Sequence, residues 1–246
     1  MNAGVDNLYS DRKRASAYAA LEFPRTYYLA FRDLPELIGR HVRGRKAFDF
    51  GCGAGRSTRF LRQLGFDVVG ADISEPMLAQ ARERDPQGQY LLMPDGDFSG
   101  FAAGAYDLVL AAFPFDNIAA MDRKVGLLTS LRKLLKPTGR LINLVSTPEI
   151  YLHEWASFST CDYPGNRAAR SGDTVLIVML DVEDRRPVED TLCTDSDYLG
   201  AYARAGLTLH ETHRPLGRTN EAQAWISETT VAPWALYVLG PAAAVD

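Results

Sequence analysis

Residues 46–56 read KAFDFGCGAGR, and this stretch decides the fold. The apolar run KAFDF predicts a short buried strand, and residues 56–65, RSTRFLRQLG, predict an amphipathic helix that ends at its glycine. Between them lies the glycine loop Gly51-Cys52-Gly53-Ala54-Gly55. Glycines let the backbone turn tightly and approach a ligand closely, and the start of a helix presents unpaired N–H groups. The stretch therefore predicts a nucleotide-type ligand at a strand-to-helix turn.

The next predicted strand ends in an acidic residue. Residues 67–72, DVVGAD, predict a strand that ends at Asp72, which lies 17 residues after Gly55. A carboxylate at the end of the second strand of such a unit is placed to accept hydrogen bonds from both ribose hydroxyls. This spacing favours ribose binding over a simple acidic loop residue.

Two charged residues next to the loop distinguish between ligand classes. A dinucleotide fingerprint requires a third glycine at the position of Arg56, where this chain has a bulky cation. Asp49 precedes the loop, and its charge would repel a pyrophosphate but suits an α-ammonium group. S-adenosylmethionine carries an ammonium group and a ribose and has no phosphate. The charge pattern therefore favours S-adenosylmethionine over a nicotinamide dinucleotide.

The remaining chain continues the alternation of strands and helices, which predicts an α/β fold with a doubly wound, mostly parallel sheet. Further strands are expected at 90–93, 106–113, 140–146, 207–216 and 233–240, further helices within 8–43 and at 124–135 and 196–205, and a hairpin at 173–180 and 188–193. We expect one domain over 1–246. It comprises an N-terminal helical lid (1–44), a cofactor-binding core (45–147), an aromatic cap with a hairpin (148–195), and a C-terminal helix with strands (196–246).

Four segments carry a resemblance to a known family: DFGCGAGRSTRFL, VVGADIS, YDLVLAAFPFDNI and LRKLLKPTGRLINLVS. In motif, order and spacing they resemble the class I S-adenosylmethionine-dependent methyltransferases, in particular the small-molecule branch. The resemblance implies a Rossmann-like sheet of seven strands with an antiparallel last strand. It also implies methyltransferase activity, with S-adenosylmethionine as the cofactor and S-adenosylhomocysteine as the product.

The same resemblance implies roles for individual residues on the cofactor side. Asp49, Gly51, Gly53 and Gly55 would cradle the methionine part, Asp72 would bind the ribose, Ile73 would pack on the adenine, Asp95 with Gly96 would receive the adenine amino group, and Ala112 and Phe113 would line the methionyl group. The chain departs from the family at Asp95-Gly96-Asp97, so either aspartate could reach the adenine. It also has FPFDN after the fourth strand, where the family often carries a histidine.

The acceptor side is expected to lie over the carboxyl ends of the strands. Asp116 and Asn117 follow the fourth strand and are candidates to orient or deprotonate an acceptor, or else to cap a helix. His153 is the candidate general base on pKa grounds, although an acceptor nitrogen with a lone pair needs none. Trp155, Tyr9 and Tyr28 are expected to bind a small, flat substrate.

Three segments extend the comparison to a particular substrate. YYLAFRDLP, PDGD and TPEIYLHEWASFST together resemble the methyltransferases of azapteridine antibiotics of the toxoflavin type. That resemblance implies N- or O-methylation of a heterocycle in secondary metabolism.

Composition excludes several other classes. A net charge of −4 gives no reason to expect nucleic-acid binding, and three cysteines without a Cys/His cluster predict no metal site. No apolar run is long enough to span a membrane, no amphipathic membrane face suggests a lipid or quinone acceptor, and a cytoplasmic location is expected. A nicotinamide-dependent oxidoreductase and a non-catalytic S-adenosylmethionine-binding protein remain the alternatives.

Overall fold

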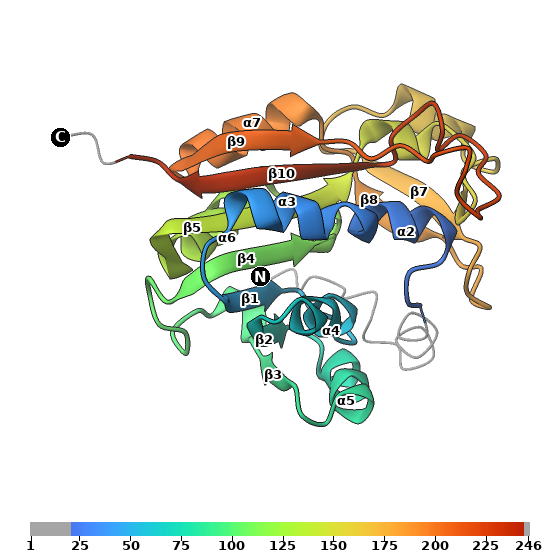
Figure 1. The fold of residues 1–246 in the computed structure, drawn as a ribbon. Coiled ribbons are helices and arrows are strands. Elements are labelled where there is room, and N and C mark those ends of the chain that lie inside the picture. The colour runs from blue at the N-terminus through green and yellow to red at the C-terminus, as the bar shows by residue number, and fades with distance from the viewer. Residues whose placement is uncertain (1–20, 244–246) are drawn as a thin grey trace.

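The computed structural model describes residues 21–243, which form a central sheet with helices on both faces (Figure 1). Seven strands lie in the order β3-β2-β1-β4-β5-β10-β9. The first five in the chain are parallel, whereas β10 runs antiparallel to both β5 and β9. The strands are β1 Lys46–Phe50, β2 Asp67–Asp72, β3 Gln89–Leu92, β4 Tyr106–Ala112, β5 Leu135–Ser146, β9 Leu207–His213 and β10 Trp234–Pro241. The predicted fold is confirmed.

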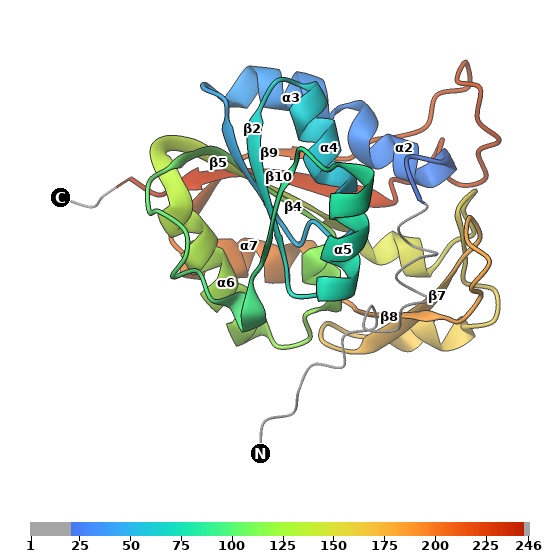
Figure 2. The same cartoon turned by 90° about the horizontal axis from the view of Figure 1, so that it is seen from below.

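Helices cover both faces of the sheet (Figure 2), and an apolar cluster lies on each face. One cluster contains side chains of α2, α3 and α4, and the other contains side chains of α6 and α7. The helices are α2 Arg25–Arg32, α3 Leu34–His41, α4 Arg56–Gln63, α5 Glu75–Arg84, α6 Met121–Leu134 and α7 Asp195–Arg204. Because both faces are covered, the central strands are continuously apolar; β4, for example, is buried from Asp107 to Ala111.

Local capping chemistry explains where the helices start. Ser74 caps α5, since its side chain accepts a hydrogen bond from the backbone N–H of Met77 at 3.4 Å. Thr194 and Asp197 form a capping box at the start of α7, so this helix begins one residue before the predicted Ser196.

The start of β5 differs from the prediction. The sequence 136–140, KPTGR, was expected to be a turn between a helix and the strand, but the strand already pairs with β4 at Leu135. The pairing then shifts register, because Tyr106 pairs with Leu135 while Leu108 pairs with Arg140. The turn residues are therefore present as a bulge inside β5.

The cap is a second, three-stranded sheet in the order β6-β7-β8, inserted between β5 and α7. Its strands are β6 Phe158–Ser159, β7 Thr174–Met179 and β8 Val188–Thr191, and β7 and β8 are antiparallel, as the predicted hairpin requires. A long irregular segment, 214–233, follows β9 and lies over α2 (Figure 1). The prediction that β9 continues to residue 216 was wrong, since this strand ends at His213.

Candidate functional site

The glycine loop connects β1 to α4 at the carboxyl end of the sheet. Gly51 and Gly55 both have left-handed backbone angles, with φ of 70° and 79°. A Cβ atom at Gly51 would lie 2.7 Å from Cβ of Pro114, and one at Gly55 would lie 2.6 Å from the hydroxyl of Tyr90. Both conformation and space thus require glycine at these positions.

Asp49 is fully buried directly beneath this loop. Its Oδ2 accepts hydrogen bonds from the hydroxyls of Ser57 at 2.7 Å and Thr58 at 2.6 Å, while its buried Oδ1 has no hydrogen-bond partner in the part of the chain that the structure describes. Burial raises the pKa of Asp49 to about 6. An unpaired buried acceptor costs free energy, and a donor supplied by a ligand would remove that cost. The site therefore fits an ammonium group.

Asp72 ends β2 on the other side of the loop. Its Oδ2 accepts from the backbone N–H of Gly53 and its Oδ1 from that of Ser74, both at 2.8 Å. Burial raises its pKa. Each carboxylate oxygen has a second lone pair, so Asp72 can hold the loop and still accept hydrogen bonds from ligand hydroxyls.

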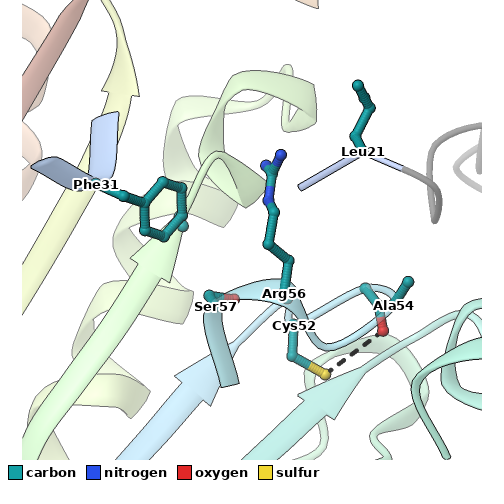
Figure 3. Close-up of a pocket in the computed structure, with 9 residues that line it drawn as sticks. Leu21, Phe31, Cys52, Ala54, Arg56 and Ser57 are labelled. Atoms are coloured by element: carbon teal, nitrogen blue, oxygen red, sulfur yellow. Dashed lines mark hydrogen bonds between the residues drawn. The ribbon is translucent and has the colours of Figure 1, made fainter. Parts of the chain in front are cut away.

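A cavity lies directly above the loop (Figure 3). It encloses about 410 Å³, part of it open to solvent, and its lining residues are Leu21, Phe31, Gly51, Cys52, Gly53, Ala54, Arg56, Ser57 and Ala112. Figure 3 shows the side chain of Arg56 extending from the loop toward Leu21 and Phe31. The side chain of Cys52 packs in a cluster with Leu78, Ala81 and Tyr90, and this burial raises the pKa of its thiol.

Aromatic rings surround the guanidinium of Arg56. Its central carbon lies 4.8 Å from the ring centroid of Tyr27, 5.4 Å from that of Phe31 and 5.7 Å from that of Phe23. Nη1 of Arg56 donates to the backbone carbonyl of Glu22 at 2.7 Å. These contacts hold the cation over the loop at the cavity.

The predicted adenine side is partly described. Ile73 is 45% exposed and follows Asp72, whose strand partner Leu92 is also 45% exposed. Asp95 and Gly96 lie in the helical turn η2, Pro94–Gly96, but the side chain of Asp95 lies outside what the structure describes. Oδ1 of Asp97 accepts from the backbone N–H of Ser99 at 2.9 Å. Neither Ile73 nor Leu92 is among the residues that line the cavity.

Ala112 and Phe113 follow β4 and occupy different surroundings. Ala112 lines the cavity. Phe113 has a left-handed φ of 73°, and its ring packs against Tyr27 and Trp234 with centroid distances of 6.1 and 4.8 Å. Its side chain thus belongs to the apolar cluster behind the cavity.

Asp116 does not lie where an acceptor base was expected. It belongs to the helical turn η3, Pro114–Asn117, and is 6% exposed. Oδ2 accepts from Ser146 Oγ at 2.8 Å, and Oδ1 accepts from the hydroxyl of Tyr198 at 3.4 Å. Burial raises the pKa of Asp116 to about 6. In this conformation Asp116 bonds other residues of the protein interior. It neither lines the cavity nor caps a helix.

Other predicted acceptor residues are also separated from the cavity. Trp155 is fully buried and donates from its indole to the carbonyl of Ile150 at 2.8 Å, so it cannot contact a substrate in this conformation. His153 is exposed, with its ring 6.0 Å from that of Trp155. Tyr28 stacks on Trp225 at 6.5 Å. None of these three lines the cavity found among residues 21–243, and Tyr9 lies outside the described residues.

Two residues of this region were missed from the sequence. Asp190 on β8 accepts hydrogen bonds from Asn117 Nδ2 at 2.7 Å and from the hydroxyl of Tyr151 at 3.1 Å, and burial raises its pKa to about 7. Glu228 is fully buried in the segment 214–233. No local motif marks either residue, since each acquires partners from distant parts of the chain.

Glu228 joins three segments that are distant in the sequence, which we call the cover: α2, residues 155–158 and residues 225–228. Of these, α2 reaches the cavity through Phe31. Oε1 of Glu228 accepts from Thr26 Oγ1 at 2.6 Å and from the backbone N–H of Ala156 at 2.8 Å. Its Oε2 accepts from the backbone N–H of Ile226 at 2.8 Å. Thr26 precedes Tyr27, so this carboxylate also positions the aromatic contact to Arg56.

The strand order, the glycine loop and the acid after β2 define the class I methyltransferase fold. Solved structures share it: the CcbJ methyltransferase from Streptomyces caelestis has a TM-score of 0.64 at 17% identity, covering 93% of this chain and 96% of that one. DesVI from Streptomyces venezuelae has a TM-score of 0.61 at 18% identity, covering 94% and 99%.

Residues 48–143 match the family model described as "Methyltransferase domain", which confirms the resemblance for this segment. A demethylmenaquinone methyltransferase from Tropheryma whipplei is 35% identical over 101 residues, 40% of this chain and 41% of that relative. A ubiquinone biosynthesis O-methyltransferase from Bordetella avium is 30% identical over 110 residues, 43% and 44%. The chain thus spans less than half the length of these curated relatives.

Within residues 21–243, no helix has the length and apolar character needed to cross a membrane.

Proposed function

We propose that the protein transfers a methyl group from S-adenosylmethionine to a small, flat, aromatic or heterocyclic molecule. The observation that carries this proposal is the pair of carboxylates beside the glycine loop, the buried Asp49 and the partly buried Asp72. Asp49 would meet a pyrophosphate with negative charge at close range, but it matches a ligand with an ammonium group and no phosphate, while Asp72 matches the ribose.

The chain's own residues would hold the cofactor in an extended pose. Asp49 would accept from the ammonium group through Oδ1, and Asp72 would accept from the ribose hydroxyls. Ile73 would pack on the adenine, and Asp95 would accept from its amino group. When bound, the cofactor supplies an electrophilic methyl group on a sulfonium ion.

The acceptor would be methylated by positioning. In-line displacement gains most of its rate from the alignment of the two reactants, so a nitrogen with a free lone pair needs no base. Among the described residues that line the cavity there is no histidine or carboxylate, which supports an acceptor of this kind. His153 and Asp116 would take part in the reaction only after a rearrangement of the cap or of η3.

Two acceptor classes are supported by different observations. Resemblance of the segments around Tyr27, Asp95 and Trp155 supports an azapteridine of the toxoflavin type. The names of two relatives support a quinone precursor. Incubation with S-adenosylmethionine and one of these compounds, followed by mass spectrometry, distinguishes them, because only a true acceptor gains a methyl group.

Titration calorimetry with S-adenosylhomocysteine and, separately, with NADH tests the cofactor class. We expect binding of S-adenosylhomocysteine and none of NADH. Binding of NADH without any response to S-adenosylhomocysteine would support a nicotinamide-dependent oxidoreductase instead. Binding of S-adenosylhomocysteine without turnover of any acceptor would favour a non-catalytic binding protein.

Substitution of Asp72 tests the ribose contact. Asp72→Ala removes a charged acceptor worth about 1.5–3 kcal/mol, so the affinity for S-adenosylhomocysteine should fall about tenfold to hundredfold. Asp67 lies at the opposite, exposed end of the same strand, and Asp67→Ala is the matched control. Equal affinities of the two variants would refute the ribose assignment.

A further inference from the structure

Arg56 occupies a distinctive position in the cavity. It is the first residue of α4, directly after Gly55, and its side chain is one of those that line the cavity. Three rings, those of Phe23, Tyr27 and Phe31, surround the guanidinium. A cation enclosed by aromatic faces is less screened by water than one on the surface, so it interacts more strongly with a ligand charge.

Charges of both signs lie close to the glycine loop. Arg56 lines the cavity, whereas Asp49, in the strand before the loop, is fully buried and is not one of the lining residues. Oδ1 of Asp49 has no hydrogen-bond partner among residues 21–243. The two groups interact, because the charge of Arg56 lowers the pKa of Asp49, against the larger opposite effect of burial. A carboxylate and a guanidinium close to the same loop are complementary to an α-amino acid, which carries an ammonium group and a carboxylate on one carbon.

We infer that Arg56 binds the α-carboxylate of the cofactor's methionine end, so that Arg56 and Asp49 together select a ligand with an intact amino acid group. The inference rests on the proposed function, since it assigns a residue within the same cofactor site. A guanidinium suits this role because its planar N–H groups match the two oxygens of a carboxylate.

Arg56 is also attached to the chain segment before α2. Its Nη1 donates to the carbonyl of Glu22, while Arg59, one turn later, bonds the Glu22 side chain at 2.7 Å and the carbonyl of Ala54 at 2.9 Å. Both arginines hold Glu22, but only Arg56 lines the cavity. Arg59 is therefore the matched control, since its loss also releases Glu22 without removing a charge from the cavity.

The wild-type protein provides the first test. Calorimetry compares S-adenosylhomocysteine with its decarboxylated analogue, in which hydrogen replaces the carboxylate. We expect the analogue to bind about tenfold to hundredfold more weakly, the range for a charged hydrogen bond. Equal affinities would overturn the inference but not the proposed function. Failure of S-adenosylhomocysteine itself to bind would overturn both.

The variants assign the effect to Arg56. Arg56→Gln should weaken binding of S-adenosylhomocysteine by the same factor and leave binding of the decarboxylated analogue nearly unchanged, so that the discrimination disappears. Arg59→Gln should keep the discrimination. An equal loss for both ligands in Arg56→Gln would overturn the inference, because the arginine would then support the cavity wall rather than bind the carboxylate.

A more conservative variant guards against misfolding. Arg56→Lys keeps the positive charge but loses the planar pair of donors, so it should retain part of the discrimination. Circular dichroism of each variant verifies the fold. Full discrimination in a folded Arg56→Gln protein would likewise contradict the assignment.

Discussion

The two sides of the cavity are built from contacts of very different range. On the glycine-loop side, Asp49 bonds residues eight and nine positions away, and Asp72 bonds Gly53 over 19 positions. In the cover, Thr26 bonds Ser157 over 131 positions and Glu228 over 202. We call the glycine-loop side, residues 46–72, the floor. It is one strand–loop–helix–strand unit, whereas the cover is assembled from three distant parts of the chain.

Because of this difference, the residues that would bind the ligand and the residues that cover it belong to different parts of the structure. The floor presents backbone N–H groups and carboxylates that local geometry fixes, while the cover depends on a few buried polar contacts to hold its aromatic rings in place. We therefore expect the floor to tolerate loss of the cover, but expect the cover to open as a unit when one contact fails.

The strongest test of this separation is Glu228→Ala. It leaves two buried donors, Thr26 Oγ1 and the backbone N–H of Ala156, without their acceptor, so the free energy of unfolding should fall by about 3 kcal/mol or more. Hydrogen exchange should speed up at the α2 amides and remain slow in β1 and β2. Glu189 on β8 is exposed, and Glu189→Ala should change stability by less than about 0.5 kcal/mol. Simultaneous loss of protection in β1 and α2 would show that the two sides are one unit.

A substitution in the floor should have a smaller effect on stability but a direct effect on binding. Gly55→Ala places a Cβ 2.6 Å from the Tyr90 hydroxyl at a left-handed φ. We expect a loss of about 2 kcal/mol in urea unfolding and weaker S-adenosylhomocysteine binding. In α6, a Cβ at Gly126 meets nothing within 4 Å, so Gly126→Ala should stabilise the protein slightly. If Gly55→Ala binds S-adenosylhomocysteine as tightly as the wild type, the glycine loop does not contact this ligand.

The smallest effect concerns the pH dependence of the free protein. The pKa of Asp49 rises from 3.8 to about 6 on folding. Its contribution to the free energy of unfolding is therefore fully present below pH 3.8, where Asp49 is protonated in both states, and is lost as pH rises through about 6. Asp49→Asn removes this titration, so the variant should gain about 1–2 kcal/mol relative to wild type between about pH 4 and pH 7. Parallel stability curves from urea unfolding at several pH values would contradict this expectation.

The same contrast explains how much the sequence revealed. The alternation of strands and helices, the loop glycines and the placement of Asp72 at the end of β2 follow from local periodicity and spacing, and the structure has them as expected. The structure buries Trp155 and Asp116, and this could not be predicted because burial depends on which distant side chains pack around a residue. Trp155 lies in the apolar cluster that contains Leu29 and Trp234, and Asp116 bonds Ser146 and Tyr198, which are 30 and 82 positions away.

The cover depends on a contact with β10, the last strand of the sheet to be synthesised. Trp234 begins β10, and its indole donates to the carbonyl of Thr26 at 2.9 Å over 208 positions. The floor between residues 46 and 72 can form its loop as soon as β2 has left the ribosome, but α2 reaches its final place only after Trp234 has been made. Contacts of such range slow folding. During translation, the cofactor floor should therefore exist before anything encloses it.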